Sequence, residues 1–317
     1  MLNALQSIIT VLLMVGLGFL LTRRGWFDQT AGVLVSRLVV QVALPAYMIA
    51  NLMGGYDRNR LIAMLPGLPV PFAVMLISYL VAMLIAALLK VREDRRGAFQ
   101  SMFALSNAVF IGLPVNLMLF GDASLSSALL YYIANTTLFW TIGVYGIAKD
   151  GALRHGRPKP SLLSWQGLRR ILSPPLVGFL TAVILILTGI SLPRSIMDTC
   201  RYLGSMTTPL SMLFIGMVIA RVNWNELRFE PDFAVVLAGR FVVTPLLMVL
   251  ALKLTDLPLL MRQVFLMQAA MPAMTQNPIL AEAYGADAEY TAIGTSLTTL
   301  AAPLTIPLYM TLVSGLT

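Results

Sequence analysis

Nine stretches of this sequence contain no charged residue, and each is 19 to 29 residues long. They cover residues 1–22, 38–56, 61–89, 97–121, 123–148, 171–193, 202–220, 263–281 and 290–317. A tenth apolar stretch, 233–254, is interrupted by Arg240 and Lys253. A helix needs roughly 20 apolar residues to cross the hydrocarbon core of a bilayer. The pattern therefore predicts an all-α integral membrane protein with about ten transmembrane helices.

The composition agrees with lipid as the solvent and excludes several classes of site. Only 11% of the residues are charged, whereas a soluble domain carries about 25%. Cys200 and His155 are the only cysteine and histidine, so we expect no intramolecular disulfide and no metal site. We also expect no cofactor. An intramembrane enzyme is disfavoured because no acidic pair and no Ser/Lys or Cys/His set lies within the spans.

The basic residues predict the topology rather than a nucleic-acid partner, although the net charge is +8. With ten spans, the odd-numbered loops hold 14 Lys and Arg residues and the even-numbered loops hold 6. Cytoplasmic loops of membrane proteins collect Lys and Arg. We therefore expect a multi-pass protein of the cell membrane with both termini on the outer side.

The long polar segment 149–170 divides the chain into two halves of five spans, residues 1–148 and 171–317. Five is odd, so the second half must cross the membrane in the opposite sense to the first, as in the inverted repeats of secondary transporters. Three proline pairs recur at 164 or 165 residues: Pro45 with Pro209, Pro114 with Pro278, and Pro66 with Pro231. Helix packing alone is the competing explanation for these echoes.

The fourth and ninth spans contain prolines flanked by amides, which predicts two broken helices. Proline lacks an N–H and clashes with the preceding turn, and unwound backbone at membrane depth is tolerated where it is buried or lines a cavity. A helix restarting at Pro114 or Pro278 presents free N–H groups and partial positive charge, which bind anions. The predicted substrate-binding residues are Asn107, Gly112, Pro114, Asn116, Asn135, Arg240, Thr275, Gln276, Asn277 and Pro278.

Other candidates have two interpretations each. Arg240, near the middle of the eighth span, either attracts an anionic substrate or ties helices together. Glu282 either exchanges protons or forms a solvated helix end. Tyr47, which follows Pro45, is a candidate to line the cavity, whereas Arg37 is expected to snorkel toward the interface.

In these segments the sequence resembles the auxin efflux carrier family, whose bacterial branch includes malonate and malate permeases. The resemblance covers essentially the whole chain. It depends on the 5+5 layout, on Ser36-Arg37-Leu38 to Leu44-Pro45, and on the break from Asn107 to Pro114. It also depends on Arg240 with Pro245, and on Asn277-Pro278 to Tyr284-Gly285-Ala286-Asp287.

The resemblance implies a fold like that of sodium/proton antiporters and bile-acid symporters, with spans four and nine crossing at unwound prolines. It also implies carboxylate binding at the crossing, elevator-like movement of a transport domain against a scaffold domain, and dimerisation through the scaffold. Asn135 resembles the fifth-span asparagine that lines the pocket. Plant members carry a charged pair in the third span, but residues 61–89 have no charge here, so the coupling ion is left open.

These features together predict alternating-access transport of a small carboxylate, such as malonate, malate or an auxin-like acid. A channel or passive pore for small anions and a membrane sensor are the alternatives. The sequence offers no ring-forming filter motif and no sizeable soluble domain, which disfavours both. Saturable transport with counterflow separates the carrier from a pore.

Overall fold

The computed structural model describes residues 2–55, 57–156, 158, 174–221 and 230–314. These residues are helical apart from short connections and one isolated antiparallel bridge, between Ser106 and Ala273. Contacts divide the chain into two compact units. Unit 1 comprises residues 1–66, 113–129 and 172–222, and unit 2 comprises residues 67–112, 130–171 and 223–317.

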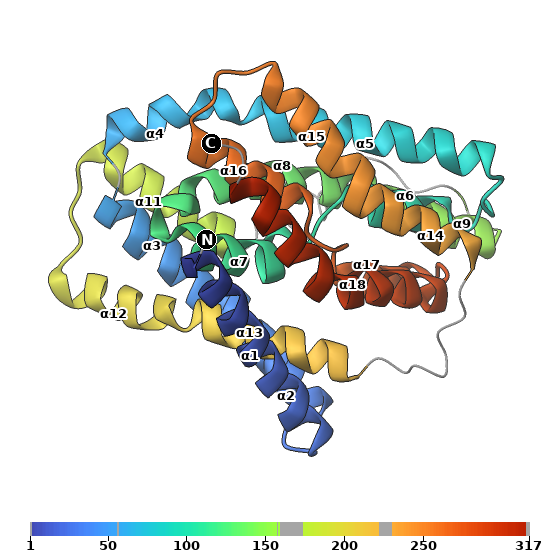
Figure 1. Cartoon of the computed structure of the whole chain (residues 1–317), viewed down its shortest axis with the longest axis horizontal. Helices are drawn as coiled ribbons and strands as arrows, with labels where there is room; N and C mark the ends of the chain where they lie inside the picture. Colours follow the sequence, from blue (N-terminus) through green and yellow to red (C-terminus); the bar gives the residue numbers. More distant parts are fainter. Residues whose placement is uncertain (1, 56, 157, 159–173, 222–229, 315–317) are drawn as a thin grey trace. The chain divides into compact units, whose positions relative to one another are not determined.

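Unit 1 is built around two helix packings that join segments distant in the sequence. Helix α1 packs along α13, and α3 packs against α11 and α12 (Figure 1). The elements are α1 (Leu2–Arg23), α2 (Gln29–Leu38), η1 (Val39–Ala43), α3 (Leu44–Gly55), α4 (Arg58–Met64), α7 (Leu113–Phe120), η4 (Asp122–Ser124), α11 (Pro174–Thr188), α12 (Arg194–Ser205) and α13 (Thr207–Ala220).

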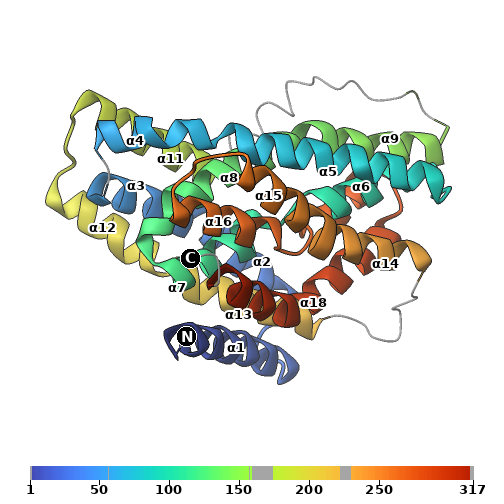
Figure 2. The same cartoon turned by 45° about the horizontal axis from the view of Figure 1, so that its top comes forward.

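Unit 2 contains α6, which packs against both α5 and α9 (Figure 2). Two elements, η2 (Leu65–Gly67) and α8 (Leu125–Leu138), begin in unit 1 and end in unit 2. The others are α5 (Pro69–Leu88), α6 (Arg96–Ala104), η3 (Ala108–Gly112), η5 (Phe139–Gly143), α9 (Val144–Arg154), α14 (Pro231–Ala238), η7 (Gly239–Val243), α15 (Thr244–Lys253), α16 (Leu259–Ala269), α17 (Gln276–Tyr284) and α18 (Ala288–Ser314).

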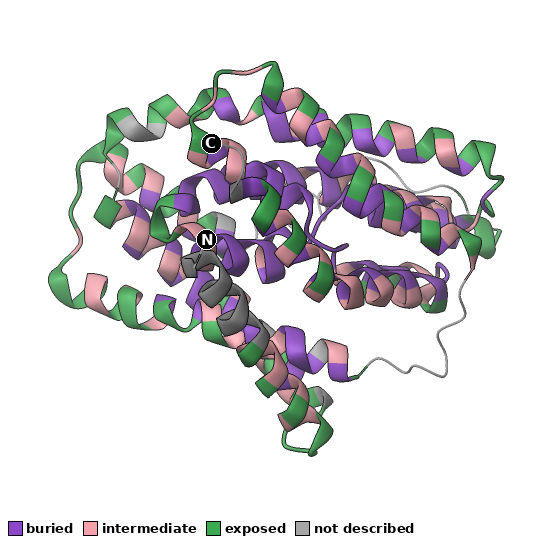
Figure 3. Cartoon of the chain, viewed as in Figure 1, coloured by how far each residue is buried: buried purple, intermediate pink, exposed green. Residues whose placement is uncertain are grey.

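Several helices have the length and composition of membrane spans. Among the described residues, four helical stretches are long and apolar enough to cross a bilayer, namely 30–55, 62–88, 231–253 and 288–313. On α5 one face is buried, whereas large apolar side chains on the other face are exposed (Figure 3). Those exposed residues are Leu76, Ile77, Leu80, Met83, Leu84 and Leu88. An apolar exposed face of this kind suits contact with lipid rather than water.

Three of the four π-helical turns in the described part of the chain end two residues before a proline, and the fourth, η5, does not. The turns η1, η3 and η7 precede Leu44-Pro45, Leu113-Pro114 and Thr244-Pro245. Because proline donates no backbone hydrogen bond and crowds the preceding turn, a widened turn at this place accommodates the ring. At these three places the proline thus accounts for the widened turn before it.

The breaks in the fourth and ninth spans are present, but their positions differ from the prediction. The first break lies at residues 105–107, and the chain turns helical again at Ala108, six residues before Pro114. The second break lies at residues 270–275, and α17 restarts at Gln276, two residues before Pro278. The expectation that helices restart at the prolines was therefore wrong, because each proline is accommodated inside the new helix.

The predicted linker 149–170 is partly helical. Helix α9 continues from the predicted fifth span to Arg154. Residues 159–173 lie outside the described part of the chain.

Helices α6 and α9 touch through glycine, which gives the first testable prediction. A Cβ on Gly97 would lie 2.1 Å from the Gly146 carbonyl carbon, so backbone would meet backbone. We expect Gly97→Ala to destabilise the protein by about 1–3 kcal/mol, because neither helix can yield without moving apart. Gly16→Ala is the matched control, since a Cβ there meets nothing within 4 Å. Equal melting temperatures of both variants in detergent would contradict this packing.

Candidate functional site

The two broken helices of unit 2 meet at their unwound segments. Residues 105–107, after α6, and residues 270–275, after α16, are here called the crossing. The Asn107 N–H donates to the Pro272 carbonyl oxygen at 2.7 Å. Together with the bridge between Ser106 and Ala273, this bond pairs the two segments antiparallel. Each segment thereby supplies hydrogen-bond partners for backbone groups of the other, because these groups have no partner within a helix at the break.

One side chain from another helix supports each unwound segment. Asn135 on α8 accepts from the Ser106 N–H at 3.1 Å, and its Nδ2 donates to the Ser106 carbonyl oxygen at 2.8 Å. On the other segment, Thr298 on α18 accepts from the Ala273 N–H at 3.1 Å. The structure thus shows Asn135 holding backbone at the crossing. Thr298 was missed from the sequence, although it follows Asn135 by 163 residues, close to the spacing of the proline pairs.

Two buried asparagines at the crossing have their oxygens engaged and their nitrogens free. Asn107 Oδ1 accepts from the Phe110 N–H at 3.1 Å and so caps the start of η3. Asn277 Oδ1 accepts from the Ser101 hydroxyl at 2.7 Å. Both side chains are at most 1% exposed, and neither Nδ2 has a hydrogen-bond acceptor among the described residues. The crossing therefore carries two buried amide donors that lack an acceptor.

Arg240, in the η7 turn, is fully buried and incompletely paired. Its Nη2 donates to the Ala269 carbonyl oxygen, the last of α16, at 2.5 Å, and the Tyr131 hydroxyl lies close to the guanidinium. Nε and Nη1 have no acceptor in the described part of the chain, and no carboxylate described there forms an ion pair with it. A buried cation without a counter-ion is costly, so this position favours a negatively charged partner.

Gly112 allows η3 to approach the end of α16. A Cβ on Gly112 would lie 2.0 Å from Gln268 Oε1, and Gln268 Nε2 donates to the Ala108 carbonyl oxygen at 3.3 Å. A side chain at residue 112 would therefore displace Gln268 from the start of η3. Gln268 was not predicted as a site residue, because one glutamine inside an apolar run gives no distinctive signal.

The structure brings together only part of the predicted set. Asn107, Asn135, Arg240 and residues 275–278 belong to unit 2 and border the crossing or its helix ends. Thr275, Gln276 and Pro278 are partly exposed there. Pro114 and Asn116 are buried in α7, which clusters with unit 1. These last two residues therefore belong to the other compact unit, whereas Asn107, Asn135 and Arg240 belong to unit 2.

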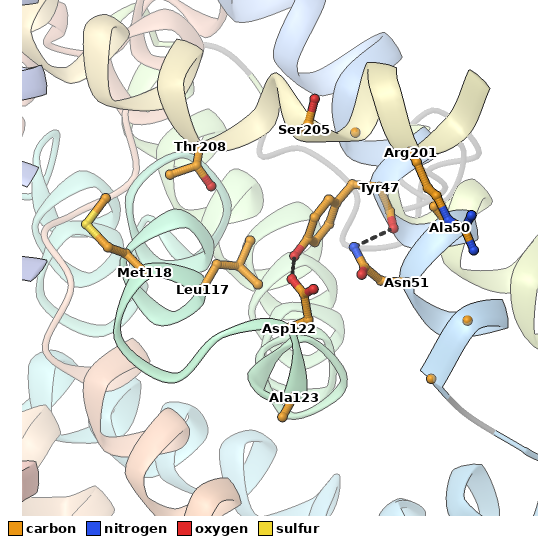
Figure 4. Close-up of a pocket in the computed structure, with 13 residues that line it drawn as sticks. Tyr47, Ala50, Asn51, Leu117, Met118, Asp122, Ala123, Arg201, Ser205 and Thr208 are labelled. Carbon is orange, nitrogen blue, oxygen red and sulfur yellow. Dashed lines mark hydrogen bonds between the residues drawn. The ribbon is translucent and has the colours of Figure 1, made fainter. Parts of the chain in front are cut away.

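Unit 1 contains a cavity of about 830 Å³ that both polar and apolar residues line (Figure 4). Tyr47 points across it, and its hydroxyl donates to Asp122 Oδ1 at 2.6 Å. Tyr47 was predicted to line the substrate cavity, and it lines this cavity of unit 1. Arg201 reaches the cavity from α12 but also pairs with Asp198 at 3.1 Å. The remaining polar lining is Asn51, Ser205 and Thr208.

A cluster of ion pairs lies at one end of unit 2. Arg95 pairs with Glu230 and with Asp287, both at 2.8 Å, and Arg154 pairs with Asp287 at 3.0 Å. The Arg95 guanidinium also lies 4.6 Å from the Tyr290 ring centroid. Burial raises the pKa of Asp287, but the Tyr290 N–H and the Arg95 guanidinium outweigh burial and hold that pKa below its ordinary value. The side chain of Glu282 lies outside the described residues, so neither interpretation of it is decided.

Comparisons with known proteins identify the family. Residues 3–310 match the family described as membrane transport protein. An uncharacterized transporter of Methanocaldococcus jannaschii is 24% identical over 310 residues, covering 96% of this chain and 97% of that protein. An uncharacterized transporter of Methanothermobacter thermautotrophicus is 25% identical over 311 residues, covering 96% of each. The chain belongs to the membrane transport protein family, and its predicted kinship with auxin efflux carriers is confirmed.

Proposed function

We propose that this protein is a secondary transporter that binds a small organic anion at the crossing and moves it by alternating access. The carrying observation is the pair of buried Nδ2 groups of Asn107 and Asn277, which lack an acceptor. An amide NH2 group can only donate, and the oxygen of each of these amides already accepts a hydrogen bond. A carboxylate has two acceptor oxygens and no donor, so it complements such a pair.

Charge at the site supports an anion over a neutral solute. Arg240 holds the end of α16 with one nitrogen and keeps two nitrogens without an acceptor. The N-terminal ends of η3 and α17 add partial positive charge at the same unwound segments. We infer a mono- or dicarboxylate substrate such as malonate, malate or an auxin-like acid.

The transport mechanism proposed is of the elevator type, in which unit 2 carries the crossing and unit 1 serves as scaffold. The Asn135 and Thr298 supports are at matching places in the two halves, which supports a 5+5 inverted repeat. The proposed setting is the cell membrane, with both termini outside and dimerisation through the scaffold. The residues of the crossing do not indicate whether transport is coupled to protons or to sodium.

Counterflow in proteoliposomes tests this function against its alternatives. Vesicles containing the purified protein are preloaded with malonate, and uptake of trace labelled malonate from outside is followed. A carrier gives transient accumulation above equilibrium and saturates, whereas a pore gives simple equilibration and single-channel currents. Binding without any transport would favour a sensor. Malate and an auxin-like acid are the further substrates in the same assay, with an uncharged sugar as control.

A further inference from the structure

We propose that Asp150 is a proton-binding site of unit 2 and that its ionisation positions α6, thereby setting the anion affinity of the crossing. This inference rests on the proposed function, because it assigns a role to a residue remote from the anion site. The Asp150 side chain is only 1% exposed. Its Oδ1 accepts from the Gly97 N–H at 3.0 Å, and its Oδ2 accepts from the Ala98 N–H at 2.8 Å.

No cation forms an ion pair with Asp150 among the described residues. The arginines of the neighbouring turn and of α9 are committed elsewhere: Arg95 to Glu230 and Asp287, Arg96 to Glu93 and the Val91 carbonyl, and Arg154 to Asp287 and Asp94. A buried carboxylate without a cation favours its neutral form. Asp150 is thus a carboxyl whose charge is balanced mainly by two backbone N–H groups.

The charged and titratable groups that act on Asp150 are few. Asp94, in the turn before α6, raises its pKa, and Lys149 on α9 lowers it. Tyr79 on α5 and Tyr290 on α18 lie within electrostatic range. Burial is the largest effect and, against the two N–H bonds, raises the pKa of Asp150 to about 7. The group therefore changes charge near neutral pH.

A short chain of contacts links Asp150 to the anion donors. Ionised Asp150 holds two consecutive N–H groups in the first turn of α6. Protonation turns one oxygen into a hydroxyl and removes the negative charge, so the hydrogen bonds from those N–H groups become weaker. Ser101, one turn further along α6, donates to Asn277, whose free Nδ2 is a proposed substrate contact. Greater mobility at the start of α6 therefore weakens the hydrogen bond from Ser101 that positions the Asn277 side chain.

The direction of the effect follows from this chain. Ionised Asp150 holds the first turn of α6 in place and so favours anion binding. Protonated Asp150 holds this turn less tightly and so weakens anion binding. Lys and Arg are abundant in the loops at this end of unit 2, which is the predicted cytoplasmic end. A carrier of this design would bind its anion more tightly where the pH at that end is high and release it where the pH is low.

The test is malonate affinity of the full-length protein from about pH 6 to about pH 9, with wild type and three variants. In wild type we expect affinity to rise about fivefold or more, with a midpoint near pH 7. Asp150→Asn should remove the pH dependence. Asp94→Asn, which spares Asp150 and removes a neighbouring negative charge, should lower the midpoint. Glu93→Gln, exposed at the same turn, is the matched control and should behave as wild type.

An infrared titration separates failure of this inference from failure of the proposed function. Asp150 should give a protonated-carboxyl band that disappears as the pH rises through neutrality. In Asp94→Asn the midpoint pH of this disappearance should be lower. In Glu93→Gln the band should titrate as in wild type. If malonate does not bind but this band titrates, the proton site stands and the substrate assignment fails. A wild-type pH profile that Asp94→Asn and Asp150→Asn both leave unchanged, or the absence of the band, overturns the proposal.

Discussion

Replacing Arg240 with methionine is expected to weaken malonate binding strongly while leaving the melting temperature unchanged or higher. The guanidinium is fully buried, and two of its three nitrogens lack an acceptor in the described part of the chain. Removing a charged partner from a desolvated ion pair costs about 2–5 kcal/mol of binding free energy. Affinity should therefore fall by about 30-fold to several thousand-fold.

Stability separates the two interpretations of Arg240. Replacing an uncompensated buried charge by an apolar side chain of similar length is often neutral or stabilising. If Arg240 instead serves mainly to tie helices through the Ala269 carbonyl oxygen, Arg240→Met should lower the melting temperature and spare binding. Arg37→Met is the control, since Arg37 is exposed. Arg240→Lys keeps the charge and should therefore recover part of the lost affinity. The recovery should be incomplete, because lysine lacks the planar fork of donors.

Truncating the two free amides should remove most of the remaining affinity. A hydrogen bond to a charged group is worth about 1.5–3 kcal/mol, so Asn107→Ala and Asn277→Ala should each weaken malonate binding about 10- to 150-fold. The measurement is equilibrium binding by calorimetry, with counterflow rates in parallel. Asn107 also caps η3 through its Oδ1, so Asn107→Ala should lose some stability as well.

Two comparison variants show whether the effect belongs to the free nitrogens. Asn135→Ala removes an amide whose oxygen and nitrogen both hold Ser106 backbone, so it should lower stability and transport together. Asn51→Ala removes an amide of the unit 1 cavity and should leave malonate affinity within about twofold, as expected for a residue outside the site. Loss of binding in Asn51→Ala, with Asn277→Ala unaffected, would move the site to that cavity.

The sequence predicted the features that follow from hydrophobicity and proline chemistry. Charge-free runs marked the apolar helices, and the amide-flanked prolines marked the two helices that break. It placed the breaks too far along the chain, because proline acts on the preceding turn: the break at 105–107 lies upstream of Pro114, beyond the η3 turn. Asn116 was included for the same reason and lies in α7, within unit 1.

The remaining features depend on contacts between segments distant in the sequence. Thr298 supports Ala273 across 25 residues, and Asp150 reaches the start of α6 across more than 50. No local pattern reveals that Asp150 is buried without an ion-pair partner in the described part of the chain, because the nearby arginines pair with other acids only in the folded unit. The role of Arg240 also depends on such contacts. Attracting an anionic substrate and tying helices together differ only in what surrounds the guanidinium in the folded protein.

The bromine of bromomalonate, located by anomalous scattering in crystals of the wild-type protein, marks the bound anion most directly. We predict a peak beside the side chains of Asn107 and Asn277 in unit 2, absent from crystals of Asn277→Ala. A peak confined to the Tyr47 and Arg201 cavity of unit 1, or none at the crossing at saturating concentration, would contradict anion binding by the two unwound segments.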